Sequence, residues 1–105
     1  MTYQINITDQ ANQDLRNIFE YIAFELQEPQ VAIGQLNRLE KEIYSLDQMP
    51  ERYRVYDREP WRSRNLHIMP VDNYLVFYIP KTDDKTVYIT RVFYGRMDID
   101  NQLGV

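Results

Sequence analysis

The stretch 74-YLVFYI-79 decides the fold of this chain, because it is an unbroken run of apolar and aromatic residues. A run without polar alternation is typical of a strand that is covered on both faces. TVYITRVFY, at 86–94, has the same strand-forming composition, and the polar stretch at 81–85 is short enough to join the two runs as a hairpin. We therefore predict a hairpin whose first strand is central in a sheet.

A further strand is predicted just before this hairpin, at Ser63–Val71. The preceding residues 51–61 lack a clean period and contain Pro60, which predicts a loop with a short turn. If the strand begins at residue 62, its period of two places Arg62 and Arg64 on one face.

The N-terminal half has a different periodicity. Tyr3, Ile5 and Ile7 alternate with polar residues, as in a half-buried strand, and Thr8 or Asp9 can then cap a helix. The apolar residues of this predicted helix, about five turns long, are Ala11, Leu15, Ile18, Phe19, Ile22 and Leu26. After Glu28-Pro29, those of a second helix are Ala32, Leu36, Leu39, Ile43 and Leu46.

These patterns predict an α+β fold. The expected order is strand, helix, helix and three strands, with an antiparallel two-helix hairpin packed on a small, mostly antiparallel sheet. A short C-terminal tail or helix after Gly95 could use Ile99 and Leu103 as anchors. The length of 105 residues predicts that 1–105 is a single domain.

Composition limits the possible functions. The chain has no cysteine, so a disulfide framework and a thiolate metal site are excluded. No apolar run approaches the roughly 20 residues that cross a bilayer, and the N-terminus does not resemble a signal peptide, so we expect a cytoplasmic protein without membrane contact.

The charge is unevenly distributed. The formal net charge is -4, and residues 1–48 hold three basic against eight acidic side chains, which gives -5. Residues 49–96 hold nine basic against six acidic side chains, which gives +3. The second half could therefore present a basic surface to an anionic partner, or simply a solvated one.

Familiar enzyme motifs are missing. The three glycines form no nucleotide-binding loop, and the single histidine, His67, has no serine motif beside it. We expect His67 to be a sheet residue with an ordinary hydrogen bond, and we expect neither a metal nor a cofactor.

Arginine could supply a phosphate site instead. If Arg62 and Arg64 face Arg91 or Arg96 of the last strand, their guanidinium groups could hold a phosphate with bidentate hydrogen bonds. Tyr94 could stack on a base or act as a hydroxyl donor or acid. Solvated arginines and a packed tyrosine remain the alternative for the same residues.

Four motifs in this order resemble the RelE/ParE superfamily of bacterial type II toxins. They are I-x-I-T-x-x-A-x-x-D-L-x-x-I-x-x-Y-I-A at Ile5–Ala23, L-x-x-x-P at Leu46–Pro50, Y-L-V-F-Y at Tyr74–Tyr78 and I-T-R-V-F-Y-G-R-M-D at Ile89–Asp98. The resemblance covers almost the whole chain. It implies a growth-inhibiting toxin neutralised by a cognate antitoxin, which would use strand-edge or helix-in-groove contacts.

The resemblance also implies one of two targets. RelE-like members cut messenger RNA on the translating ribosome without metal, through attack of the ribose 2′-OH on the adjacent phosphate. ParE-like members inhibit DNA gyrase by binding. A toxin fold that has lost its target and only binds the antitoxin is a third possibility.

Departures from the nuclease pattern favour the gyrase function. RelE-like nucleases usually carry an arginine where this chain has Leu75, and leucine cannot donate to a phosphate. Where nucleases use histidine, this chain has Tyr94, a poor base at neutral pH. A nuclease would then have Arg62, Arg64, Tyr94 and Arg96 as its catalytic set, whereas a gyrase inhibitor would bind its target through Arg91, Arg96, Met97 and Asp98.

Overall fold

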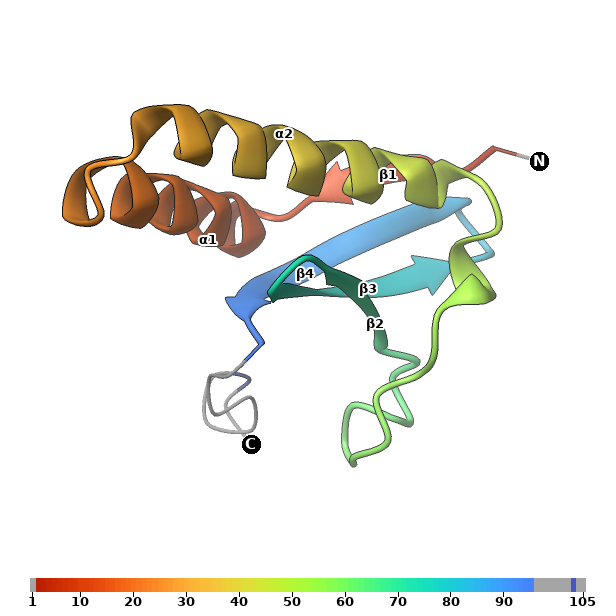
Figure 1. Cartoon of the computed structure of the whole chain (residues 1–105). Coiled ribbons are helices and arrows are strands. Elements are labelled where there is room, and N and C mark those ends of the chain that lie inside the picture. The colour runs from red at the N-terminus through yellow and green to blue at the C-terminus, as the bar shows by residue number, and fades with distance from the viewer. Residues whose placement is uncertain (1, 96–102, 104–105) are drawn as a thin grey trace.

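The computed structural model describes residues 2–95 and residue 103, which form a layer of two helices on a four-stranded sheet (Figure 1). The elements are β1 (Gln4–Ile7), α1 (Asp9–Glu20), a π-helical turn η1 (Tyr21–Glu25), α2 (Pro29–Tyr44), the 3₁₀ turns η2 (Ser45–Asp47) and η3 (Pro50–Arg52), β2 (His67–Val71), β3 (Tyr74–Lys81) and β4 (Thr86–Tyr94). The predicted order of one strand, two helices and three strands is confirmed, as is the α+β class.

The sheet has the strand order β1-β4-β3-β2. β3 pairs antiparallel with both β2 and β4, and β1 pairs parallel with β4. The apolar run 74-YLVFYI-79 thus lies in a central strand, as its composition predicts.

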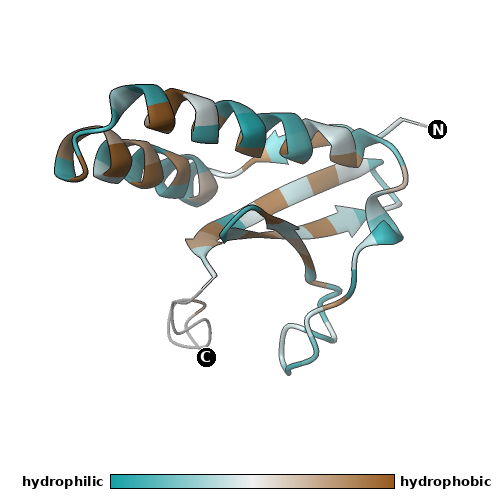
Figure 2. Cartoon of the chain, in the orientation of Figure 1, coloured by the Kyte–Doolittle hydropathy of each residue, from teal (hydrophilic) through white to brown (hydrophobic). Residues whose placement is uncertain are grey.

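The helical hairpin covers one face of the sheet. Thr8 caps α1, since its hydroxyl oxygen accepts a hydrogen bond from the Ala11 amide at 3.2 Å, and Pro29 occupies the first turn of α2. The sheet below the helices carries apolar residues along its strands (Figure 2). Leu39 and Ile43 of α2 are fully buried in a core with apolar side chains of this sheet. Their burial confirms the helix phase predicted from the apolar spacing.

A second, smaller core covers the opposite face. It contains Phe77 of β3 and Phe93 of β4 with Leu66 and Ile68. Side chains from the segment before β2 and from the C-terminal end pack against it, including Trp61 and Leu103. Apolar contacts on both faces explain why β3 has no polar alternation.

The strand predicted at Ser63–Val71 begins four residues later than expected. β2 starts at His67, and the preceding residues form turns in which the Arg62 amide donates to Arg58 O at 2.8 Å and the Leu66 amide to Trp61 O at 3.1 Å. Asn65 has a φ of 62°, a left-handed conformation that a strand does not allow. Arg62 and Arg64 therefore lie in a turn and not on a strand face. The prediction for His67 is confirmed, since Nδ1 lies 2.9 Å from Asn65 O.

Candidate functional site

The last strand extends beyond its parallel neighbour. Pairing between β1 and β4 ends at Ile7 and Ile89, where the chain turns into α1. Thr8 closes this junction, because its amide and its hydroxyl both donate to Ile89 O, at 3.1 and 2.8 Å. From Thr90 to Tyr94, one edge of β4 therefore faces α1 and not another strand.

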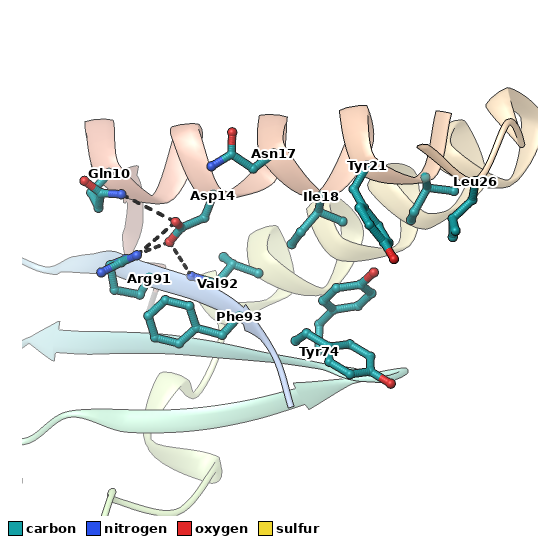
Figure 3. A pocket seen from close by; sticks show the side chains of 12 residues that line it. Gln10, Asp14, Asn17, Ile18, Tyr21, Leu26, Tyr74, Arg91, Val92 and Phe93 are labelled. Atoms are coloured by element: carbon teal, nitrogen blue, oxygen red, sulfur yellow. Dashed lines mark hydrogen bonds and ion pairs between the residues drawn. The ribbon is translucent and has the colours of Figure 1, made fainter. Parts of the chain in front are cut away.

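Asp14 of α1 takes the place of the missing strand at this edge. Its carboxylate is buried and accepts the Val92 amide hydrogen at 2.9 Å (Figure 3). The same carboxylate accepts hydrogen bonds from Arg91 Nε at 2.8 Å and Nη2 at 3.1 Å. The Arg91 guanidinium also lies 4.4 Å from the centre of the Phe93 ring. This fork-shaped ion pair fixes the end of β4 to the helical hairpin.

A groove of about 860 Å³ lies between α1 and this end of β4 (Figure 3). Gln10, Asn17 and the ion pair of Asp14 and Arg91 make one end polar. The other end is lined by apolar and aromatic side chains, namely Ile18, Tyr21, Ile22, Leu26, Tyr74 and Tyr94. An apolar groove beside an unpaired strand edge suits an extended or helical peptide with apolar anchors.

Two tyrosines form the aromatic end. The rings of Tyr74 and Tyr94 meet edge to face, with centroids 5.8 Å apart and an interplanar angle of 72°. Burial raises the pKa of Tyr74 above its ordinary value, and the neighbouring Tyr94 and Tyr21 raise it further. Tyr74 is therefore a neutral hydrogen-bonding group and not a base at physiological pH.

The strand face predicted to bring Arg62 and Arg64 to Arg91 is wrong, because both residues lie in a turn; the alternative partner, Arg96, lies outside the described residues. Arg62 is exposed, with Nη1 3.6 Å from Asp57, and the Arg64 guanidinium lies 5.1 Å from the Trp61 ring centre. The segment that carries them pairs with β2, whereas Arg91 lies on β4 and binds α1. Arg62 and Arg64 thus contact residues of their own turn segment, and Arg91 contacts α1.

The remaining predicted residues have different outcomes. Tyr94 lies in the groove and contacts Tyr74, not the arginines of the turn. Arg96, Met97 and Asp98 lie outside the described residues, as does Ile99.

Asp14 is the site residue that the sequence predictions missed. It follows Ala11 by three positions and precedes Ile18 by four, so it falls on the apolar face of the first helix. An acidic residue in that phase indicates a buried carboxylate with a partner. Its partner could not be named from the helix alone.

Residues 2–95 and 103 contain neither a candidate metal site nor a candidate membrane helix. That part of the chain contains no group of three or more histidine, aspartate and glutamate residues placed to hold a metal ion. Nor does it contain a helix that is long and apolar enough to span a bilayer.

Solved structures with the same fold are toxins of bacterial and archaeal toxin–antitoxin systems. The chain is similar to a structure of the chromosomal ParDE system from P. aeruginosa, with a TM-score of 0.72 and 17% identity over 89% of this chain and 96% of that one. A chain of the RelBE2 complex from Mycobacterium tuberculosis has a TM-score of 0.67 and 20% identity, with 90% and 92% covered. The archaeal RelE–RelB complex from Pyrococcus horikoshii gives 0.62 and 19%, with 91% and 98% covered. None of the curated proteins matches the sequence.

The fold of this chain is thus the one found in ParDE and RelBE structures. The family model described as the ParE toxin of the type II toxin–antitoxin system parDE matches residues 5–99. The chain therefore belongs to the ParE toxin family.

Proposed function

We propose that this protein, as one toxin domain over 1–105, arrests growth in the bacterial cytoplasm by binding DNA gyrase, and that a cognate antitoxin neutralises it. Membership of the ParE family, shown by the match over residues 5–99, is the observation that carries the proposal. The ParE family model matches almost the whole chain, and a ParDE structure is among its structural neighbours.

The arrangement of side chains supports binding over RNA cleavage. Arg91 is held by Asp14, whereas Arg62 lies beside Asp57 and Arg64 over the Trp61 ring. Leu75 packs against the second core and offers no donor to a phosphate. Charge stabilisation of a cleaved phosphate needs several donors converging on one point, and the described residues do not bring these arginines together.

The target-binding surface in this proposal includes Arg96, Met97 and Asp98, which follow β4, and the basic turn that carries Arg62 and Arg64. Arg91 contributes by holding β4 in place through Asp14. The positive charge of residues 49–96 would favour approach to a complex of gyrase with DNA.

The groove beside β4 is the proposed antitoxin site. The backbone N–H and C=O groups of successive residues in a strand point alternately to its two edges. The backbone groups of Tyr94 therefore point to the same edge as those of Val92, whose amide donates to Asp14. An antitoxin segment could pair with the backbone at Tyr94 and place apolar side chains between Ile18, Leu26 and Tyr74. Two of the similar solved structures are described as toxin–antitoxin complexes.

A pulse of inducible expression tests the target. Rates of DNA and protein synthesis are followed in parallel, with plasmid supercoiling and newly formed 5′ ends of messenger RNA. We expect DNA synthesis and supercoiling to fail first, with translation initially intact. Immediate arrest of translation with cuts at ribosome-occupied codons would identify an endoribonuclease instead. Unaffected growth would identify an inactive antitoxin-binding module.

The folding-defective variant Leu39→Asp, which places a charge in the first core, serves as the control for expression burden. Arrest by this variant would show that the observed effect does not depend on the folded toxin.

A further inference from the structure

The turn between the two helices exposes several large apolar side chains. Tyr21, Phe24, Leu26 and Val31 are 55%, 67%, 52% and 51% exposed. We call them the hairpin-turn patch. A single exposed apolar residue is ordinary, but a group of them within eleven residues is typical of a binding surface. The hydropathy colouring marks apolar residues at this turn (Figure 2).

Backbone geometry produces this exposure. The π-helical turn η1 ends with the Leu26 amide donating to Tyr21 O at 3.0 Å, and the next residue, Gln27, has a φ of 56°. Ile22 and Ala23 are buried, whereas Leu26, which would share the face of Ile22 in a regular helix, is exposed beyond the wider turn. π-helical turns are uncommon and occur often at functional sites.

The segment between Arg16 and Arg38, which carries the hairpin-turn patch, has charge of one sign. Residues 17–37 contain Glu20, Glu25 and Glu28 and no lysine, arginine or histidine. All three glutamates are exposed, and within the described part of the chain none forms an ion pair. The patch therefore combines apolar contact area with uncompensated negative charge.

The hairpin-turn patch is continuous with the groove. Tyr21 and Leu26 belong to the patch and also line the apolar end of the groove, where they face Tyr74 (Figure 3). A polypeptide that fills this end of the groove can thus continue over the turn without crossing a polar gap.

We infer that the hairpin-turn patch binds a basic, apolar segment of the antitoxin, with lysine or arginine side chains beside the glutamates and apolar side chains against Phe24 and Val31. This inference rests on the proposed toxin–antitoxin pairing and adds the chemistry of the partner segment. Opposite charges favour a cationic segment, whereas nucleic acid and anionic lipid are repelled. A second copy related by a two-fold axis would place the glutamates against each other.

The charge component is tested by association kinetics with the purified product of the gene adjoining the toxin gene. We expect the association rate to fall steeply from roughly 0.05 M to 0.5 M ionic strength, because salt screens charge attraction. The double variant Glu25→Gln/Glu28→Gln should lower the rate at low salt by about fivefold or more. Its matched control is Glu51→Gln/Asp83→Asn, which removes the same charge elsewhere and should leave the rate unchanged.

The apolar component is tested by Phe24→Ala, which should weaken equilibrium binding by about tenfold or more through faster dissociation. Tyr44→Ala is the matched control, since Tyr44 is 53% exposed on α2 outside the patch. Thermal unfolding of each variant must match that of the unaltered toxin, because all these side chains are exposed.

The outcomes separate this inference from the proposed function. Binding that ignores salt and survives the glutamate and Phe24 variants would overturn the inference and leave the toxin–antitoxin pairing intact. Binding that is absent altogether would overturn both. Self-association that is lost in Phe24→Ala would assign the patch to a second copy and overturn the antitoxin assignment.

Discussion

Replacing Asp14 with alanine should destabilise the protein more than any other single change to an ion pair in the described structure. The carboxylate of Asp14 holds the Val92 amide and both donors of the Arg91 fork, from a position that is 7% exposed. Alanine would leave a buried amide and a largely buried guanidinium without this partner. The end of β4 would lose its connection to α1.

The size of the effect follows from these contacts. A buried amide without a partner costs about 1–3 kcal/mol. Breaking a buried ion pair by removal of one member costs about 3–5 kcal/mol. The Arg91 side chain is 22% exposed and keeps its contact with Phe93, so we expect each contribution near its lower limit, about 4 kcal/mol in total. This loss is a large part of the roughly 5–15 kcal/mol that stabilises a domain.

Urea unfolding, followed by circular dichroism, measures the loss. We expect a lower midpoint with an unchanged slope for Asp14→Ala. A double-mutant cycle with Arg91→Ala should give a coupling energy of about 1–2 kcal/mol. Arg38→Ala is the matched control, because Arg38 pairs with Asp72 at 2.8 Å on the surface and its loss should cost at most about 1 kcal/mol. If Asp14→Ala loses no more stability than the control variant, or if the coupling energy is near zero, Asp14 does not fix the end of β4 to α1 as we infer.

Three further outcomes are expected. Tyr78→Phe should cost about 1–3 kcal/mol, because the buried hydroxyl donates to Pro50 O at 2.6 Å. Burial raises the Tyr78 pKa, so this stabilisation is complete below the ordinary value of about 10 and is lost as pH rises above it; Tyr78→Phe should flatten the alkaline loss seen in unfolding curves. Leu39→Asp should abolish cooperative thermal unfolding, since the residue is 0% exposed. Tyr94→Phe should still arrest growth if the toxin acts by binding gyrase, and a stable variant without toxicity would favour RNA cleavage.

Local periodicity predicted most of the fold. The apolar spacing of three and four residues correctly gave the buried faces of both helices except at Leu26, which follows the π-helical turn and is 52% exposed. The unbroken run at 74–79 correctly gave a central strand. These predictions succeed because each depends on residues that are neighbours along one element. The predicted start of β2 was wrong because the alternating pattern does not decide the structure there. Backbone hydrogen bonds between Arg58 and Leu66 and the left-handed conformation of Asn65 hold this segment in turns.

The candidate site was only partly predictable. Tyr94 was named in advance and lies in the groove. Asp14 could have been detected, because it is an acidic residue on the apolar face of the first helix. Its partners Arg91 and Val92, however, are 77 and 78 positions away. No local pattern connects residues so distant along the chain.

The sequence by itself determined the elements, their order, the uneven charge and the family, because these depend on composition, spacing and motif order. Tertiary structure alone decided that β1 stops at Ile7 and leaves the end of β4 open beside α1. It also placed Arg91 against Asp14 and put Arg62 and Arg64 in a turn. Strand pairing and side-chain contacts are selected by the packing of the whole chain, and only that packing turns an amphipathic helix and a strand edge into a groove.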